Sequence, residues 1–355
     1  MPLTTYERVK RMYEHKEADR VPVIDSPWAS TIERWHKEGM PEGIPFTTYF
    51  DLDKFAAIRA DNSPRYPVRV LEQTEEYTIE TNAWGTTMKR WKHAGGVPEF
   101  LDFTITDRAS WQKAKERMQP SPDRIPWERL KNNYKRWRDE GAWIQAHLFF
   151  GFDVTHSWVI GTERLLIAMI DDPEWITDIL NAQLDLDLTL LDMIWDAGYH
   201  FDEIRWPDDM GYKGTQFFSV DMYRELIKPV HRRAAEWAHA RNVKVQLHSC
   251  GDLRPLIPEL IDLGIDMLNP LEVKAGMDPV ALKQTYGDRL CFHGGLNAAL
   301  YADMERLFAE MERVIPVMKK DGGYIAATDH SVPDSVSLED FRRFVALAKK
   351  LGSYE

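Results

Sequence analysis

Residues 243–271 read VKVQLHSCGDLRPLIPELIDLGIDMLNPL, and this stretch decides the fold. Two apolar runs, 243–249 and 266–271, predict buried strands. Between them, residues 253–264 repeat apolar side chains at helical spacing and end at Gly264, which is a suitable C-cap. A strand, a helix and a second strand in this order are typical of a parallel β/α unit.

The same alternation covers most of the chain. Eight apolar runs predict strands, and from the third run onward helical patterns or helix-sized links separate them: 20–25, 54–60, 142–150, 201–206, 243–249, 266–271, 289–295 and 324–330. The longest helical patterns are 162–198 and 221–242. Eight parallel strands that close on themselves form a barrel. We therefore predict an α/β fold with a single (β/α)8 TIM barrel over residues 1–355.

Two additions to the barrel are expected. Thr4 and Glu7 have the spacing of a capping box, which predicts an N-terminal helical extension. Residues 75–91, EEYTIETNAWGTTMKRW, alternate with period two on both sides of an Asn-Ala-Trp-Gly turn, which predicts an inserted β-hairpin with Trp84 and Gly85 at its tip. No repeat or linker divides the chain, so one domain is expected.

Composition excludes several classes of function. The net charge is −12, the chain has no block of basic residues, and a nucleic-acid-binding protein is therefore not expected. No apolar run is long enough to span a bilayer, and the N-terminus does not resemble a signal peptide, which predicts a cytoplasmic protein that does not bind membranes. Two cysteines suit a reducing compartment, where a thiol is free to bind metal. The 13 tryptophans indicate either an aromatic-rich core or an aromatic-lined pocket for a flat ligand.

The active site of such a barrel lies at the C-terminal ends of its strands. His248 and Cys250 lie at the end of the fifth predicted strand and, being two residues apart, point to the same side. Imidazole and thiolate are preferred zinc ligands, which indicates a metal site. The alternative is a buried cysteine beside a hydrogen-bonded core histidine.

Zinc needs further ligands from neighbouring strand ends. Glu272 closes the sixth predicted strand and His330 closes the eighth, so both are candidates. The alternatives are that Glu272 caps the next helix or pairs with Lys274, and that His330 shapes the final loop. Cys291 lies near the start of the seventh strand, at the end of the barrel opposite the expected active site, and His293 lies in the middle of that strand. Both are therefore expected in the core.

Acidic and aromatic residues follow two other predicted strands. Asp208 and Asp209 come directly after the fourth strand, where a carboxylate can act as a general acid or hold a substrate. Capping of the loop that follows is the alternative. Asp25 and Trp28 follow the first strand and are expected to line the same mouth.

Residues 248–297 and 322–341 carry a resemblance to a known family. They read HSCGDLRPLIPELIDLGIDMLNPLEVKAGMDPVALKQTYGDRLCFHGGLN and GGYIAATDHSVPDSVSLEDF. The chain resembles the uroporphyrinogen decarboxylase superfamily over most of its length, most closely from about residue 200 onward. The resemblance implies a single α/β barrel. The superfamily includes haem-pathway decarboxylases and corrinoid-dependent methyltransferases whose zinc is held partly by a His-x-Cys motif.

Two departures separate these branches. The decarboxylases carry an Arg-Gln-Ala-Gly-Arg-Tyr loop after the first strand, whose arginines neutralise the carboxylates of the substrate. This chain has DSPWASTIERW at 25–35 instead. Because this loop lacks those arginines, it suits an octa-anionic tetrapyrrole poorly. Coenzyme M methyltransferases supply a third zinc ligand from a late Gly-Cys motif, and the matching stretch here, AATDHS at 326–331, has no cysteine. His330 or Asp329 then replaces that ligand, or Glu272 completes the site.

The resemblance is closest to the substrate-side methyltransferases of O-demethylase systems. It implies zinc as cofactor, a methoxylated, aromatic small molecule as methyl donor, and a separate corrinoid protein as acceptor. About 25 residues follow the eighth predicted strand, too few for a corrinoid domain. The implied roles are Asp208 and Asp329 as acids, Trp28, Trp84 and Phe149 as ring-stacking side chains, and Asp25 as part of the substrate pocket.

Several alternatives stay open. A decarboxylase of the uroporphyrinogen type is one, and a methyltransferase acting on methylamine, methanol or a thiol is another. The non-enzyme alternative is a barrel that binds a corrinoid or tetrapyrrole without converting it. A homodimer is one alternative for the oligomeric state.

Overall fold

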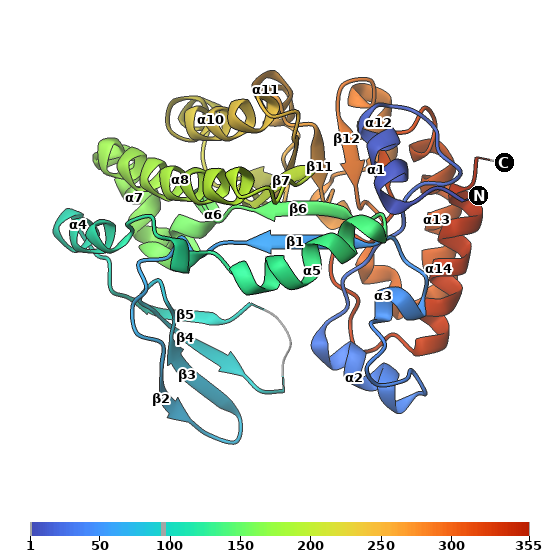
Figure 1. The fold of residues 1–355 in the computed structure, drawn as a ribbon, viewed down its shortest axis with the longest axis horizontal. Coiled ribbons are helices and arrows are strands. Elements are labelled where there is room, and N and C mark those ends of the chain that lie inside the picture. Colours follow the sequence, from blue (N-terminus) through green and yellow to red (C-terminus); the bar gives the residue numbers. More distant parts are fainter. Residues whose placement is uncertain (1, 94–96, 355) are drawn as a thin grey trace.

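The computed structural model describes residues 2–93 and 97–354. Within these residues, seven parallel strands form one curved sheet in the order β1-β6-β7-β10-β11-β12-β13 (Figure 1). Their bounds are β1 Phe55–Arg59, β6 Trp143–His147, β7 Glu203–Pro207, β10 Lys244–His248, β11 Met267–Asn269, β12 Cys291–His293 and β13 Tyr324–Ile325. The spatial order follows the sequence and helices surround the sheet, which confirms the predicted α/β barrel.

Residues 20–25 occupy the eighth position of the ring, but the prediction of a regular strand there is wrong. Val23 forms an isolated parallel bridge with Ala326, and the backbone N–H of Ile24 donates to the Ala326 carbonyl at 3.1 Å. On the other side, the Asp53 carboxylate accepts the Val23 N–H at 2.7 Å. Pro22 has no N–H, and the Asp53 side chain accepts the N–H of the next residue, Val23. Because neither residue can donate to a neighbouring strand, a strand ladder cannot form.

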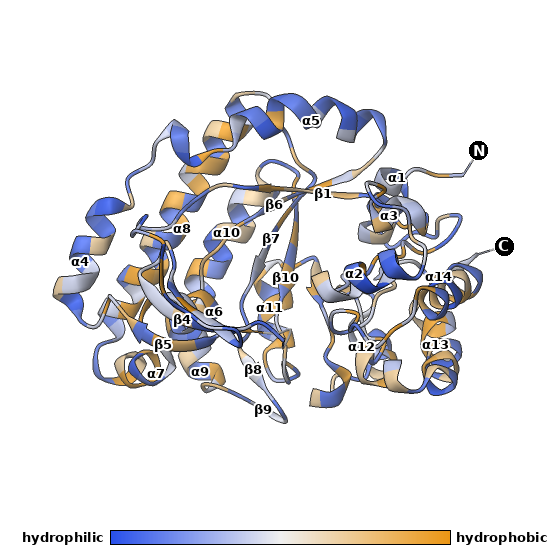
Figure 2. Ribbon diagram, turned by 90° about the horizontal axis from the view of Figure 1, so that it is seen from below, coloured by the Kyte–Doolittle hydropathy of each residue, from blue (hydrophilic) through white to orange (hydrophobic). Residues whose placement is uncertain are grey.

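Helices form the outer layer of the barrel. The long ones are α4 Arg108–Arg117, α5 Trp127–Asp139, α7 Thr162–Asp171, α8 Pro173–Asp196, α10 Lys228–His239, α11 Ile257–Leu263, α12 Pro279–Tyr286, α13 Met304–Met318 and α14 Leu338–Gly352. In Figure 2, α8 and α10 carry hydrophobic and hydrophilic residues side by side. On α8, Leu180, Leu184 and Leu191 are buried at helical spacing, so this face packs into the hydrophobic core. Gly264 ends α11 with a φ of 101°, as predicted.

Short elements connect these helices and strands. They are α6 Phe152–Val154, α9 Val220–Met222, the antiparallel pair β8 Gly211–Tyr212 and β9 Thr215–Gln216, the π-helical turns η2 Thr155–Val159 and η3 Tyr223–Ile227, and the 3-10 turns η1 Pro122–Arg124, η4 Val273–Ala275 and η5 Ala298–Ala302. Among the described residues, no helix has the length and apolarity needed to cross a membrane.

The N-terminal extension covers the bottom of the barrel. Helix α1 (Thr5–Tyr13) begins with the predicted capping box of Thr4 and Glu7, and α2 (Ala29–Lys37) and α3 (Phe46–Tyr49) follow. The Tyr13 hydroxyl donates to the buried Glu203 carboxylate at 2.7 Å. The two ends of the chain lie close together in Figure 1, where the Tyr354 N–H donates to the Asp19 carbonyl at 3.2 Å.

The predicted hairpin is part of a larger excursion. Strands β3 (Tyr77–Thr81) and β4 (Thr86–Trp91) are joined by β2 (Arg69–Gln73) and β5 (Glu99–Phe103) in a four-stranded antiparallel sheet of described residues, which lies beside the barrel in Figure 1. The turn at Trp84 faces the barrel and is buried, because the indole packs on Phe149 with ring centroids 5.9 Å apart. The sheet therefore delivers an aromatic side chain to the end of β6.

A buried carboxyl group on α8 is expected to make the stability of the protein depend on pH. Asp187 is 4 % exposed and accepts a hydrogen bond from the backbone N–H of Phe149 at 2.8 Å. Burial raises the pKa of Asp187 to about 8. From about pH 4 to about pH 8 the folded chain therefore holds a proton that the unfolded chain releases, so the free energy of unfolding falls as pH rises, by at most about 1.4 kcal/mol per pH unit.

We expect the substitution Asp187→Asn to flatten this slope, because the amide oxygen can still accept from Phe149 and no longer titrates. Chemical denaturation across this pH range measures the effect. The matched control is Asp196→Asn, at an exposed position of the same helix. An unchanged slope in Asp187→Asn would show that another group causes the pH dependence.

Candidate metal centre

Two neighbouring strands bring three metal-binding side chains together at the C-terminal end of the barrel. His248 ends β10, Cys250 follows two residues later, and Asp209 lies two residues after the end of β7. Strand β10 pairs with β7 and aligns His248 with Pro207. The Cys250 N–H donates to the Asp209 carboxylate at 2.7 Å, which fixes the two loops against each other.

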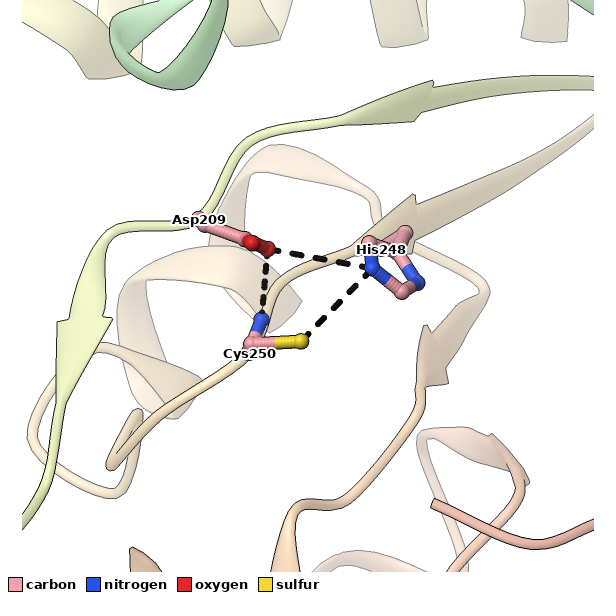
Figure 3. Close-up of side chains that lie close together, drawn as sticks. All are labelled: Asp209, His248 and Cys250. Atoms are coloured by element: carbon pink, nitrogen blue, oxygen red, sulfur yellow. Dashed lines mark hydrogen bonds and ion pairs between the residues drawn. The ribbon is translucent and has the colours of Figure 1, made fainter. Parts of the chain in front are cut away.

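The ligand atoms of these residues face one another (Figure 3). The Cys250 Sγ lies 3.7 Å from the His248 Nε2, and that nitrogen lies 3.8 Å from the Asp209 Oδ1. All three ligand atoms lie within 4.8 Å of one another, and among the described residues this is the group with the composition of a metal site. We refer to Asp209, His248 and Cys250 as the ligand triad.

Neighbouring polar groups fix the orientation of the imidazole. The Asn269 side chain donates through Nδ2 to the His293 carbonyl at 3.0 Å, so its Oδ1 faces His248. That oxygen lies 2.5 Å from the His248 Nδ1 and also accepts from the Arg205 Nη2 at 2.9 Å. Nδ1 therefore carries the hydrogen, and the lone pair of Nε2 is directed to the triad. Second ligand shells orient metal-binding histidines in this way.

The charges of the triad suit a cation. Burial and the nearby Arg205 guanidinium lower the pKa of His248 to about 4, so the imidazole is neutral at neutral pH. Burial and the Asp153 carboxylate raise the pKa of Asp209 to about 7. Burial, followed by the Asp209 and Glu272 carboxylates, raises the pKa of the Cys250 thiol. A positive ion at this place would supply the charge that a thiolate needs.

The donor set also fits zinc in geometry. Nitrogen, sulfur and oxygen are its usual ligands, and a tetrahedron with metal–ligand bonds of about 2.1 Å has edges of about 3.5 Å. The separations of 3.7 and 3.8 Å from the His248 Nε2 to the Cys250 Sγ and the Asp209 Oδ1 are close to that value. Three protein ligands leave a fourth position open, which is typical of a catalytic zinc site rather than a structural one.

The triad lines a cavity of about 430 Å³ at the mouth of the barrel. Four of the other predicted site residues line the same cavity: Asp25, Trp28, Asp329 and His330. Trp28 and His330 lie side by side, with ring centroids 5.9 Å apart. His293, which was expected in the core, is 6 % exposed and also lines the cavity. Cys291 is buried at the opposite end of the barrel, as expected.

The structure gives the two predicted acids other contacts. Asp208 is fully buried, and its carboxylate oxygens bind the Asp153 N–H at 2.7 Å and the His231 Nε2 at 2.7 Å. Asp329 accepts the N–H groups of Val273 and Ala298, both at 2.8 Å. These carboxylates hold loops together. Of the adjacent residues Asp208 and Asp209, Asp209 is the one that lines the cavity.

The two further ligand candidates lie outside the triad. The Glu272 carboxylate accepts the Gly251 N–H at 2.7 Å and pairs with Lys274 at 3.2 Å, which matches the alternative of a loop-stabilising carboxylate. His330 is exposed at the rim of the cavity. Asp209 instead brings a third ligand atom close to His248 and Cys250, because the loop after β7 reaches these two residues directly.

Trp84 and Phe149 do not line the triad cavity. They line a second cavity of about 350 Å³, at the ends of β1 and β6, together with Arg59 and His147. Asp25, in contrast, lies in the triad cavity but bonds the hydroxyl of Thr328 at 2.9 Å. Sequence reasoning missed Asn269 and Arg205. Both residues are polar and lie at inward-facing positions of β11 and β7, and this placement was the signal that could have identified them.

Comparison with known proteins identifies the family. The model for the uroporphyrinogen decarboxylase (URO-D) family matches residues 154–351, more than half of the chain. The protein belongs to the uroporphyrinogen decarboxylase family. The match includes every strand from β7 onward and the whole ligand triad, and it confirms the family resemblance of the sequence.

One solved structure supports the fold of this family member. A methyltransferase from Methanosarcina mazei superposes with a TM-score of 0.65 at 17% identity, covering 98% of this chain and 99% of that chain. A psychrophilic family 10 endo-β-1,4-xylanase gives a TM-score of only 0.36 at 15% identity, covering 68% of this chain and 87% of that chain. No curated protein matches the sequence significantly.

The contact between Asn269 and His248 leads to a prediction for this family member. In Asn269→Ala the His248 Nδ1 loses its acceptor, so the imidazole can rotate or change tautomer. We expect the dissociation constant for zinc to rise by about 10- to 100-fold. Competition with a chromophoric zinc chelator measures the change. Asn132→Ala, at an exposed position of α5, is the control, and equal zinc affinity in both variants would refute the orienting role.

Proposed function

We propose that this protein is a zinc- and corrinoid-dependent methyltransferase that transfers a methyl group from a methoxylated aromatic compound to the cobalt(I) of a separate corrinoid protein. The ligand triad, placed on the catalytic face of the barrel and lining a cavity, carries this proposal. The solved relative from Methanosarcina mazei is described as a methyltransferase, which agrees with this class of reaction. His248, Cys250 and Asp209 are the proposed zinc ligands.

The charges of the cavity favour this reaction over decarboxylation of a porphyrinogen. Asp25, Asp209 and Asp329 line the cavity, and the single arginine among its lining residues, Arg205, already donates to Asn269. Such a surface repels a substrate with many carboxylates. A methyl ether has no charge at the reacting bond and is not affected by this repulsion.

The reaction requires a Lewis acid, a surface that binds the aromatic ring and a proton donor. When bound, zinc supplies a Lewis acid that stabilises negative charge on the ether oxygen as its bond to the methyl carbon breaks. The methyl group, without the bonding electron pair, goes to cobalt(I), and the oxygen takes up one proton to give a phenol. Trp28 offers a ring surface beside the cavity, and the adjacent His330 is placed to deliver that proton.

The test is a methyl-transfer assay with the zinc-loaded protein. Cob(I)alamin or the cognate corrinoid protein is incubated with a panel of methoxylated aromatics, and conversion of cobalt(I) to methylcobalt is followed by its visible spectrum. We expect methylcobalt and a free phenol in equal amounts. Release of carbon dioxide from uroporphyrinogen would overturn the proposal. Transfer from methylamine, methanol or a thiol, but not from ethers, would retain the reaction and change the substrate.

A further inference from the structure

A second cavity lies one strand away from the ligand triad. It has a volume of about 350 Å³ and opens between the ends of β1 and β6 and the loop at 60–63. Pro207 lines it, and Arg205, two residues earlier on β7, lines the triad cavity. The sheet order β6-β7-β10 therefore sets the two cavities side by side.

The second cavity contains a cation without a counter-charge. The Arg59 side chain lines it and forms no ion pair or hydrogen bond with any residue that the structure describes. The carboxylate of Asp61, which also lines the cavity, is already bound by the Arg65 Nε at 2.6 Å and by the Ser63 hydroxyl at 2.6 Å. The Arg59 guanidinium is thus available to an anion that enters the cavity.

An imidazole beside Arg59 lacks partners as well. His147 ends β6 directly opposite Arg59 in the β1–β6 register. Its Nε2 is buried and has no hydrogen-bond partner among the described residues. Burial, reinforced by the Arg205 guanidinium, lowers the pKa of His147 to about 3, so the ring is neutral and holds one N–H that can donate. A buried polar group without a partner is unusual and indicates a ligand.

The remaining surface of the cavity is aromatic. Trp84 and Phe149 line it, and their ring centroids are 5.9 Å apart at an angle of 50°. Such rings bind another aromatic ring by edge or offset contacts. A flat apolar body with one anionic end therefore matches the composition of this cavity.

We propose that the second cavity binds an aromatic carboxylate, with the carboxylate group held by Arg59 and His147 and the ring against Trp84 and Phe149. One guanidinium and one neutral imidazole suit a single negative charge, whereas a phosphate dianion or a tetrapyrrole would need more cations. The identification of this acid as the methyl donor rests on the proposed function. Neighbouring strands lie about 4.8 Å apart, so β6 and β10 are separated by roughly 10 Å, the scale of one ring with a substituent at each end.

Binding of benzoate tests the site without any methyl transfer. Isothermal titration calorimetry of the zinc-loaded protein with benzoate and with its neutral analogue benzamide separates the contribution of the carboxylate charge to the binding affinity from that of the ring. We expect benzoate to bind more tightly than benzamide, and Arg59→Gln to raise the dissociation constant of benzoate by about 10-fold or more while leaving that of benzamide nearly unchanged. The control is Arg306→Gln, which removes an equal charge from an exposed place on α13.

Two further measurements separate the carboxylate site from binding at the metal and from misfolding. The same Arg59 dependence is expected after zinc is removed with a chelator, which excludes binding of benzoate to the metal. Arg59→Gln should keep the thermal unfolding midpoint of the wild type, because the Arg59 side chain forms no ion pair or hydrogen bond within the described residues. Equal affinity for benzoate and benzamide, or no effect of Arg59→Gln, would overturn the carboxylate site.

The results of these experiments distinguish a failure of the proposed carboxylate site from a failure of the proposed function. Arg59-dependent binding of benzoate without methyl transfer from any ether would retain the carboxylate site and overturn the proposed function. Methyl transfer at equal efficiency from a methoxybenzoate and a methoxybenzamide, unaffected by Arg59→Gln, would overturn the carboxylate site and retain the proposed function.

Discussion

Replacing Cys250 by alanine is expected to lower the zinc content of the purified protein from about one ion per chain to near zero. The substitution removes the sulfur of the triad and leaves His248 and Asp209, and two protein ligands do not hold zinc tightly. His248→Ala should have the same effect. Metal analysis of protein purified without chelators measures both results.

Cys291 provides the matched control for this experiment. It is the second cysteine of the chain, it lies buried at the start of β12, and its Sγ contacts the Met12 carbonyl at 3.3 Å. Cys291→Ala should therefore retain zinc. Asp209→Ala should weaken zinc binding more than His330→Ala does, because His330 lies outside the triad. Loss of zinc in Cys291→Ala alone would show that the metal lies at the other end of the barrel.

The second large effect is expected for Gly251→Ala, directly after the triad cysteine. Gly251 has a φ of +84°, and a Cβ placed there would lie 2.1 Å from the backbone carbonyl carbon of Gly211. The backbones of the two loops touch at this point, so neither can yield without moving Cys250 or Asp209. We expect a loss of about 3 kcal/mol or more in the free energy of unfolding, from backbone strain and overpacking together, with loss of zinc.

Gly198→Ala separates strain from overpacking. Gly198 has a φ of +86°, nearly the same as Gly251, but a Cβ there meets no atom within 4 Å. Its cost should be only about 1 kcal/mol, from the left-handed conformation alone. Urea denaturation of both variants gives the comparison. Equal destabilisation would show that the contact with Gly211 does not constrain the triad loops.

Seven of the eight strands were predictable because each is a buried apolar run, and helical patterns or helix-sized links separate these runs from 142–150 onward. Residues 20–25 have the same apolar character, and their failure to form a strand depends on Asp53, about 30 positions away, whose carboxylate captures the Val23 N–H. The hairpin at 75–91 was predictable from its turn, whereas its pairing with β2 and β5 was not. Long-range contacts of this kind have no local signature in the sequence.

The ligand triad likewise combines residues that a local pattern predicts with residues whose roles depend on long-range contacts. His248 and Cys250 were predictable because both follow from the position of one strand end. Asp208 and Asp209 are adjacent, and successive side chains beyond a strand point in opposite directions, so an error of one residue exchanges the buried member for the one facing the cavity. The roles of Asn269 and Arg205 depend on contacts across three strands and could not be read from spacing alone.

The irregular closure of the barrel replaces regular strand pairing on one side, at residues 20–28, which we call the seam. Between β13 and β1, the seam is held by the isolated bridges of Val23 with Ala326 and of Pro27 with Val332, and by the Asp53 carboxylate, whereas β7 and β10 share five aligned residue pairs. Amide hydrogens at this seam should exchange with solvent through small fluctuations, and those of the β7–β10 ladder only on extensive unfolding. Because Asp25 and Trp28 lie at the seam and line the triad cavity, we expect local opening there to widen the mouth of that cavity and to admit a bulky ring.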